Sequence, residues 1–528
     1  MINFRQYPNM TSITIPNGIR LSSGDFNNAF RDMSNLIHSN FNHINVISMK
    51  SAYRNCTNLT DNPMYGNNVT DIGFAYRDCY NLTGSPVCGE NVTNMYGAYY
   101  KCQNLTGSPV CGNNVTNIGF TYFNCFNLTG NPVCGNNVTN MEGAYTSCSN
   151  LTGSPVCGEN VTNMWQTYYN CTNLTGSPVC GNNVTDMSKA YEGCTNIKGD
   201  PVCGNNVTNM SNSYRASGVT GNPICSEKVI DIGFAYYGCF NLTGSPVCRN
   251  NVVDMYSAYY NCYNLTGSPV CGNNVTNMDF AYYDCCNLTG SPVCGNNVIG
   301  MGGTYFNCFN LTGNPVCGNN VTNMYYTYYD CRNLTGSPVC GENVTNMGWA
   351  YYNCGNLTGS PVCGNNVTDM YSTYSNCGKL TGNPVCGNNV TNMSRTYQNC
   401  YNLTGSPVCG NNVTDMYSTY YNCYSLTGSP VCGDKVTNMY KTYYNCKNLI
   451  GFMYCYNTNI TNFTNCFGAK NKSRRINIYV PPVSTTLESI LVNNTSSIVG
   501  KNITWSSNST CYWNTAYNIY IYPSLFAD

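Results

Sequence analysis

The chain repeats one phrase of 23 residues through most of its length. One copy, residues 401–423, reads YNLTGSPVCGNNVTDMYSTYYNC, and near-identical copies stand directly before and after it. The cysteine that ends each copy recurs every 23 residues from Cys56 to Cys446, apart from Ser217 in one copy and a single deletion in the next. A unit this short cannot bury an apolar face alone, whereas stacked copies bury a continuous one. The repeat therefore predicts a solenoid in which each copy is one coil.

We number the positions of a copy as slots, beginning with the terminal cysteine at slot 1. Leu at slot 4, Pro at slot 8, Val at slot 14, Met or Ile at slot 17, Ala or Thr at slot 20 and Tyr at slot 21 recur in most copies. These constant slots predict the interior of the stack, and the variable slots predict its exterior. The segment NVTNM predicts a short parallel strand. Slots 18–23, such as YSTYYN, predict one turn of α-helix or 3₁₀ helix.

The beginning and end of the regular repeat predict three regions. Residues 1–55 carry degenerate coils, because Met33 and Met10 keep the 23-residue spacing where later copies have cysteine. Residues 56–466 are the regular repeats, and together the coils number about 19. Residues 467–528 lose the repeat, and their segments INIYV and YNIYIY alternate like strands. This region predicts a small β-rich cap for the last coil, or an attachment or oligomerisation module.

The repeat resembles that of a known family. The pattern V-T-N-M-x-x-A/T-Y-x-x-C-x-N-L, as in VTNMYGAYYKCQNL (residues 92–105), is similar to the repeat of the BspA-like leucine-rich repeat surface proteins, and TSITIP (residues 11–16) is similar to their strand segment. The resemblance covers about residues 10–466. It implies a leucine-rich-repeat solenoid and a surface protein acting in attachment, since members are mostly adhesins of bacteria and some protists, with relatives in phages. The segment GSPVC departs from the family's regular apolar strand and adds a cysteine that the family does not require.

Of the 37 cysteines, 34 form two columns, and Cys286, Cys466 and Cys511 lie outside them. Seventeen fill slot 1, as Cys79, Cys102 and Cys423 do, and seventeen fill slot 10, as Cys88, Cys111 and Cys409 do. Stacking places like residues about 5 Å apart, which is within the Cα separation that a disulfide tolerates. Free cysteine also packs well as a small buried hydrophobe, so buried thiol ladders and disulfides both stay open. The spacings of 9 and 14 residues and the lack of a CxxC motif are not a zinc pattern, and we expect no metal site.

The composition argues against several function classes. Charged residues make up 9% of the chain and 23 basic residues balance 23 acidic ones, so we expect no nucleic-acid partner and no membrane-surface patch. The only histidines are His38 and His43, which leaves the regular repeats without a base for Ser-His-Asp or Cys-His catalysis. No nucleotide-binding or HExxH motif occurs. We therefore expect no enzyme activity and no cofactor.

Location is predicted only broadly. No run of 18 apolar residues occurs, so we expect no insertion into a membrane. The first residues, MINFRQYPNM, lack the basic-then-apolar pattern of a signal peptide. The family resemblance implies an extracellular, cell-surface or virion-surface location. A removed signal, non-classical export or release inside a particle would each be compatible with that location.

The variable slots favour aromatic residues. Slots 19 and 22 are three apart and share a face of the predicted turn, so stacked copies would give an aromatic stripe. Tyr with Ser, Gly and Asn is also the composition of binding loops. The alternative is that the rings only pack on rings of the neighbouring coil. The candidate ligand-binding residues are Phe120, Phe123, Trp165, Tyr169, Phe280, Tyr283, Tyr326, Tyr329, Trp349 and Tyr352.

Two functions follow from different classes. In the first, the chain is a non-enzymatic adhesion or receptor-binding solenoid that recognises a host-cell surface protein or glycan through the aromatic stripe. In the second, it is a structural component of a filament or a phage virion, such as a tail fibre or decoration protein, and its partners are copies of itself.

Overall fold

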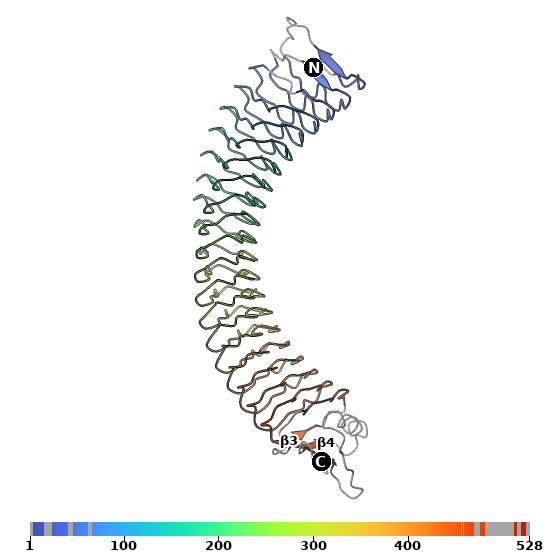
Figure 1. Cartoon of the computed structure of the whole chain (residues 1–528), viewed down its shortest axis with the longest axis vertical. Coiled ribbons are helices and arrows are strands. Elements are labelled where there is room, and N and C mark those ends of the chain that lie inside the picture. Colours follow the sequence, from blue (N-terminus) through green and yellow to red (C-terminus); the bar gives the residue numbers. More distant parts are fainter. Residues whose placement is uncertain are drawn as a thin grey trace. The chain divides into compact units, whose positions relative to one another are not determined.

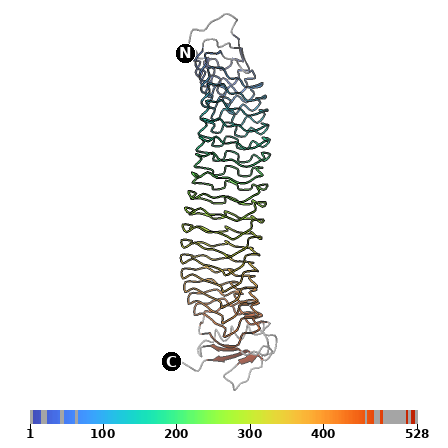
Figure 2. The same cartoon turned by 90° about the vertical axis from the view of Figure 1, so that its left-hand side faces the viewer.

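The computed structural model describes residues 4–14, 24–40, 46–61, 66–455, 457, 459–468, 476–480, 512–514 and 519–523. The chain divides into two compact units, Met1–Leu265 (unit 1) and Thr266–Asp528 (unit 2). In each unit the successive copies form stacked coils (Figures 1 and 2). The repeat therefore predicted the fold class correctly, whereas the number of coils stays a prediction.

Regular strands lie near the ends of the repeats in the described residues. In unit 1, β1 (Ser12–Thr14) pairs in parallel with β2 (His38–Asn40). Unit 2 has a four-stranded sheet that consists, in spatial order, of β3 (Gly451–Tyr454), β4 (Ile476–Val480), β6 (Ile519–Pro523) and β5 (Tyr512–Asn514). Only the β5–β6 pair is antiparallel. The strands predicted at INIYV and YNIYIY correspond to β4 and β6, and β3 joins them to the regular repeats.

Between these sheets, neighbouring coils are joined by single-residue parallel bridges at slot 16. Such bridges link Asn323 to Asn346 in unit 2 and Asn117 to Asn140 in unit 1. The threonine at slot 15 adds two hydrogen bonds: in unit 2 the amide and the hydroxyl of Thr345 donate to the Thr322 carbonyl, at 2.8 and 3.1 Å. The NVTNM segment therefore pairs in parallel, as predicted, but contributes one bridge per coil instead of a strand.

The helical turns predicted at slots 18–23 are not found in the described residues, where this segment forms consecutive β-turns. Slots 19 and 23 adopt a positive φ, which is 60° at Tyr326. Alternate amides then reach the next coil: Tyr326 donates to the Gly348 carbonyl at 3.1 Å, and Tyr328 to the Ala350 carbonyl at 2.8 Å. The amide of Thr327, between them, donates to the Met324 carbonyl of its own coil at 3.0 Å. A helix would keep these donors within one coil, so bonding between coils favours the turns.

The constant slots form the core of both units, as predicted. In one copy of unit 2 the fully buried residues are Cys331, Leu334, Val344, Met347, Ala350 and Tyr351. The slot 21 tyrosines stack through the core, and the ring centroids of Tyr305 and Tyr328 lie 5.5 Å apart at an angle of 8°. Burial of these repeated apolar side chains is the main driving force for stacking the coils.

The slot 21 tyrosine also satisfies the backbone of slot 9. The hydroxyl of Tyr328 accepts a hydrogen bond from the Val316 amide at 3.0 Å and donates one to the Val316 carbonyl at 2.6 Å. Tyr122 and Val110 make the same two bonds in unit 1. The GSPVC segment is a poor strand because of its glycine and proline, and the tyrosine hydroxyl supplies partners that a strand neighbour would otherwise provide. This explains why slot 21 holds tyrosine and not phenylalanine.

Candidate functional site

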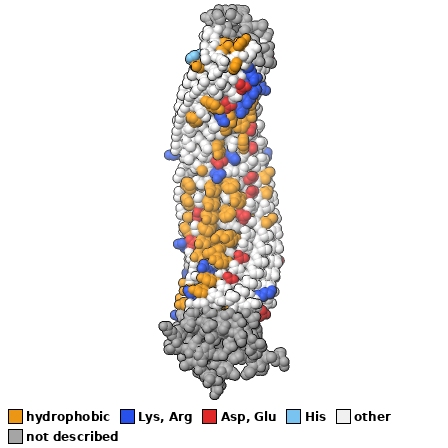
Figure 3. Space-filling view, turned by 90° about the vertical axis from the view of Figure 1, so that its right-hand side faces the viewer, with side chains coloured by type: hydrophobic (Ala, Val, Ile, Leu, Met, Phe, Trp, Pro, Cys, Tyr) orange, Lys and Arg blue, Asp and Glu red, His pale blue; other side chains and the backbone are white. Residues whose placement is uncertain are grey.

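Unit 2 carries a continuous group of surface rings, which we call its aromatic surface. In successive copies the slot 19 and slot 22 rings meet: the centroids of Tyr326 and Tyr329 lie 5.4 Å apart, and those of Trp349 and Tyr352 lie 4.9 Å apart. Figure 3 shows hydrophobic side chains gathered on one face of the molecule. The aromatic surface consists of Phe280, Tyr283, Phe306, Tyr326, Tyr329, Trp349, Tyr352 and Tyr371.

The slot 22 rings of this surface stack face to face. The centroid distances are 4.2 Å from Tyr283 to Phe306, 4.5 Å from Phe306 to Tyr329, and 4.7 Å from Tyr329 to Tyr352, with angles between the planes of 12° or less. Each ring therefore covers the face of its neighbour and presents mainly its edge to solvent. The slot 22 rings thus pack on rings of the neighbouring coils, which was the alternative to ligand binding. A partner that binds here would contact the edges of these rings.

The slot 19 rings are different, because the backbone that carries them is strained. Phe280, Tyr326 and Trp349 have φ values of 58°, 60° and 60°. This left-handed region is uncommon for residues other than glycine, asparagine and aspartate, and a bulky side chain there is an outlier. Slot 23 has the same backbone and is filled mostly by tolerant residues, such as Asn307 and Asp330. Slot 19 carries large rings in some copies and other non-glycine residues, such as Gln166 and Lys189, in others, all with a positive φ.

Unit 1 has a second group of rings around Phe120. Phe120 lies 5.9 Å from Phe123 and 6.2 Å from Trp165, measured between ring centroids. Three of the four predicted unit 1 residues therefore lie together, whereas Tyr169 makes no ring contact with a described residue. The sequence reasoning missed Phe306 and Tyr371 of unit 2 as candidates. Phe306 occupies slot 22, which was already recognised as rich in aromatics, and Tyr371 occupies slot 18.

Glycine follows several of the slot 19 rings, one coil later. Gly97 follows Phe74 and has a φ of 61°, and a Cβ at Gly97 would lie 2.6 Å from the Phe74 ring. Gly303 stands in the same relation to Phe280, with a corresponding distance of 2.7 Å. In these copies the slot 19 ring thus packs against the next coil. The glycine at slot 19 of that coil permits the backbone conformation and leaves room for the ring.

We predict that Gly97→Ala destabilises unit 1 by about 1–2 kcal/mol from the backbone conformation alone, with a further loss because the Phe74 ring must move. Chemical denaturation of the variant and the parent chain measures this loss. Gly84→Ala is the matched control, because Gly84 has a φ of 83° but its added Cβ meets no atom within 4 Å. An equal loss in the two variants would show that the ring does not depend on the space at Gly97.

The two cysteine columns have different environments. Cys79, Cys102 and Cys423 at slot 1 are fully buried, and the Cys423 thiol donates to the Tyr397 carbonyl at 3.0 Å. Most slot 10 residues, including Cys88, Cys111 and Cys409, are only half-buried, whereas Cys225 and Cys455 are buried. A glycine at slot 11 of the next coil covers most of these thiols on one side: a Cβ on Gly112 would lie 3.1 Å from the Cys88 sulfur. The other side faces solvent.

All cysteines in the described part of the chain are free thiols. Burial raises the pKa of the slot 10 thiol of Cys88 to about 11 and that of the slot 1 thiol of Cys194 to about 12. Both groups are therefore protonated near neutral pH. Since the thiolate is the nucleophile and the metal ligand, neither column is activated for covalent chemistry.

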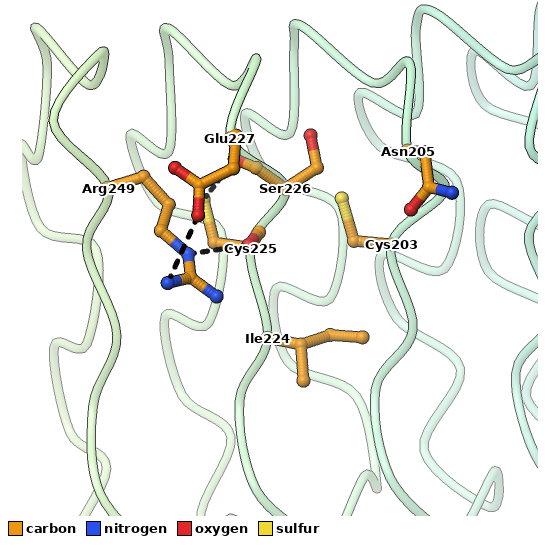
Figure 4. A pocket seen from close by; sticks show the side chains of 7 residues that line it. All are labelled: Cys203, Asn205, Ile224, Cys225, Ser226, Glu227 and Arg249. Atoms are coloured by element: carbon orange, nitrogen blue, oxygen red, sulfur yellow. Dashed lines mark hydrogen bonds and ion pairs between the residues drawn. The ribbon is translucent and has the colours of Figure 1, made fainter.

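One hollow marks the irregular 22-residue copy of unit 1 (Figure 4). It measures about 360 Å³ and is lined by Cys203, Asn205, Ile224, Cys225, Ser226, Glu227 and Arg249. The guanidinium of Arg249 donates to the Cys225 carbonyl at 3.1 Å and lies 3.3 Å from the Glu227 carboxylate. Burial raises the pKa of the Cys225 thiol to about 12. The charges are paired and the thiol is protonated, so the hollow lacks the groups for catalysis.

Within the described residues, no cluster of three or more histidine, cysteine, aspartate or glutamate side chains is arranged to hold a metal ion. The exposed His38 pairs with Asp61 at 3.1 Å, and His43 lies outside the described residues. None of the described segments forms a helix long and apolar enough to cross a membrane.

Comparison with protein families identifies the repeat. The family described as "BspA type Leucine rich repeat region (6 copies)" matches residues 3–106, 95–198, 255–381 and 325–450, which together make up most of the chain. Proteins of this family are repeat scaffolds, generally non-enzymatic and often found at the cell surface. No curated protein matches the chain.

Solved structures of bacterial leucine-rich repeat proteins are also similar to this chain. A leucine-rich repeat protein from Bacteroides ovatus is 12% identical, with 84% of each chain covered and a TM-score of 0.26. A leucine-rich cell surface protein from Faecalibacterium prausnitzii is 15% identical, with 75% of this chain and 87% of that one covered and a TM-score of 0.23. At these scores the similarity adds no argument about function.

Proposed function

Because this chain belongs to the family of BspA-type leucine-rich repeat proteins, we propose that it is a non-enzymatic attachment protein at a cell or particle surface. In this proposal the aromatic surface of unit 2 recognises a protein or glycan on a host cell. The repeats supply a rigid scaffold, and the variable slots supply the contacts.

The grouping of large rings at slot 19 of adjacent coils, on a backbone that disfavours them, is the observation that carries the proposal. The scaffold needs a left-handed residue at slot 19, and Gly303 satisfies that need without strain. Tyr326 and Trp349 occupy the same slot in the next two coils, where the backbone cost of a non-glycine residue is about 1–2 kcal/mol each. Strained residues persist where the surrounding structure holds them, and they concentrate at functional sites. A recognition role explains why rings occupy a position for which glycine is the easier choice.

The neighbourhood of these rings also suits recognition. The Tyr326 and Trp349 rings lie 5.8 Å apart in adjacent coils, and the side chain of Tyr325 beside them is 38% exposed. Tyrosine and tryptophan provide large contact areas with few rotatable bonds, and they are enriched among residues that dominate binding energy. Partly exposed rings on a rigid scaffold lose little entropy when a partner binds.

The proposal is tested with the double variant Tyr326→Gly, Trp349→Gly. We expect the purified variant to lose at least about tenfold in affinity for a cell type that the parent chain binds, because two large contact side chains are removed. Flow cytometry with labelled protein over a panel of eukaryotic and bacterial cells measures the affinity. Ser418→Gly is the matched control, because Ser418 has the same positive φ at slot 19 but carries no ring.

Unchanged cell binding in the double variant would overturn the proposal. Light scattering of the same samples tests the other class of function, in which the partners are copies of the chain. A parent chain that binds no cell type but assembles as its concentration rises would be a structural component instead.

A further inference from the structure

Unit 1 carries a column of arginines at slot 22 of its first coils. Arg31, Arg54 and Arg77 are 23 residues apart in the sequence. The backbone places them in successive coils, because the Asp32 amide donates to the Arg54 carbonyl and the Asn55 amide donates to the Arg77 carbonyl, both at 2.8 Å. Figure 3 shows Lys and Arg side chains gathered beside hydrophobic ones near this end of unit 1. We call these three residues the arginine column.

Two members of the column are paired with aspartates of their own coils. The Nε of Arg31 lies 3.4 Å from the Asp32 carboxylate, which also accepts a hydrogen bond from Arg5 at 3.1 Å. The Nε of Arg77 lies 3.2 Å from the Asp78 carboxylate. These contacts use the Nε side of the Arg77 guanidinium and leave its two terminal nitrogens without a hydrogen-bond partner among the described residues.

Arg54, in the middle of the column, has no partner at all among the described residues. It makes no ion pair and no hydrogen bond there, and its Nε is buried without a partner. The reason lies in the sequence, because slot 23 of this coil is Asn55, whereas the paired arginines are followed by aspartate. The Asn55 amide donates to Asp32 instead. The terminal nitrogens of this half-buried guanidinium therefore keep donors with which an anion can form charge-assisted hydrogen bonds.

A recess lined by rings adjoins the column. It measures about 210 Å³ and is formed by Phe74, Arg77, Tyr96, Tyr100 and Phe120. The guanidinium carbon of Arg77 lies 4.6 Å from the Tyr100 ring centroid and 5.5 Å from that of Phe74. The Phe74 and Tyr96 rings meet edge to face at 5.3 Å. The recess therefore has apolar walls and a cation at one side, the combination of a site that holds an apolar surface and orients one charged group.

We propose that the arginine column and this recess bind an acidic polysaccharide, a chain whose sugar units carry carboxylate or sulfate groups. The guanidinium groups would pair with the anions, for which arginine has a matching bidentate geometry. The ring-lined recess would hold the C–H face of one sugar unit. An acidic polysaccharide presents charges at intervals along an extended chain, just as successive coils present arginines. This site lies in unit 1, goes beyond the proposed function of the unit 2 aromatic surface and does not depend on it.

An acidic peptide is the competing ligand, and the ring-lined recess makes it the less suitable one. A run of acidic side chains would satisfy Arg54 but would bring no apolar face for Phe74 and Tyr96. A sugar unit uses both the charges and the ring walls. The choice between carboxylate and sulfate is left to the experiment, because both anions pair with arginine in the same manner.

The test measures binding of the full chain to immobilised heparin, polygalacturonate, polyglutamate and dextran at low salt. We expect binding to at least one acidic polysaccharide and none to neutral dextran, with an affinity that falls as salt rises. Arg54→Gln should lower that affinity at least about tenfold, the size expected for losing one charge-assisted interaction. Arg249→Gln is the matched control in unit 1, because Arg249 already pairs with Glu227. Circular dichroism verifies that each variant is folded.

The pattern of binding decides among the outcomes. Binding to polygalacturonate assigns a carboxylate ligand, and binding to heparin alone assigns a sulfated one. Tyr96→Ala should weaken binding to the polysaccharide and leave binding to polyglutamate unchanged; equal effects on both would overturn the sugar ligand. No binding to either acidic polysaccharide, or unchanged affinity in Arg54→Gln, would overturn the site. These results are independent of the Tyr326→Gly, Trp349→Gly variant, so failure of one proposal is distinguishable from failure of the other.

Discussion

Raising the pH above about 9 is expected to unfold unit 1 steeply, because its slot 1 thiols cannot ionise while the coils remain stacked. Burial raises the pKa of the Cys56, Cys194 and Cys239 thiols from the ordinary value of 9.0 to about 12. Between these values the unfolded chain releases protons that the folded chain keeps, so ionisation favours unfolding. The stability contributed by neutral thiols is fully present below pH 9 and is lost as the pH rises toward 12.

The expected loss is large because the thiols act together. Each thiol costs about 1.4 kcal/mol of unfolding free energy per pH unit within this window, so three of them cost about 4 kcal/mol per pH unit. Chemical denaturation at a series of pH values from 7 to 11 measures the loss. Cys194→Ser is the matched variant, because Ser217 already occupies slot 1 one coil later. It should make the fall of the unfolding free energy with pH shallower by about 1.4 kcal/mol per pH unit, the contribution of one thiol. A free energy of unfolding that stays constant up to pH 10.5 would contradict the buried-thiol account.

Tyr328→Phe is expected to destabilise unit 2 by about 2–4 kcal/mol. The substitution keeps the stacked ring but removes the hydroxyl that bonds both the amide and the carbonyl of Val316. Val316 is half-buried, and each of its backbone groups costs about 1–3 kcal/mol when it is left unsatisfied. Guanidinium denaturation of the variant and the parent chain measures the difference.

The neighbouring residue provides the control for this prediction. Tyr329 follows Tyr328 directly but points its ring into the surface stack, and its hydroxyl makes no hydrogen bond with a described residue. Tyr329→Phe should therefore change the unfolding free energy by less than about 0.5 kcal/mol. If both variants lose the same stability, then the hydroxyl of slot 21 does not support the GSPVC segment.

The interior of the fold was predictable because it repeats. A residue such as Leu334 or Val344 recurs at one spacing in copy after copy, and only a stacked core selects the same apolar side chain so often. The strands β4 and β6 were also predictable, since residue types alternate in the sequence INIYV and YNIYIY and no repeat competes with that pattern. In each case a single physical requirement fixes the residue type.

The turns at slots 18–23 were not predictable from side-chain spacing, because residues three apart share a face in a β-turn series as well as in a helix. The signal that would have found them is the residue at slot 23. Asn307, Asn353 and Asn422 stand there, and asparagine is one of the few residues besides glycine that adopt the left-handed conformation. Asparagine is also a weak helix former, so its recurrence at slot 23 argues against a helix there.

The candidate sites were predictable to different degrees. The sequence identified most rings of the aromatic surface, because aromatic residues stand out in variable slots. The backbone strain at Tyr326 could not be predicted from the sequence, since it follows from a φ angle that depends on the neighbouring coil. The arginine column was hidden by the balance of charges over the whole chain, although Arg31, Arg54 and Arg77 share slot 22 and could have been read from the repeat.

The central claim is that slot 19 carries rings for recognition and not for stability, and one paired measurement tests it most directly. The unfolding free energy and the cell affinity are measured on the same preparation of the Tyr326→Gly, Trp349→Gly variant. Relief of backbone strain offsets the lost ring contacts, so we predict an unfolding free energy within about 1 kcal/mol of the parent chain together with at least tenfold weaker binding. Unchanged affinity with a clearly lower unfolding free energy would contradict the claim, because the rings would then serve the stack alone.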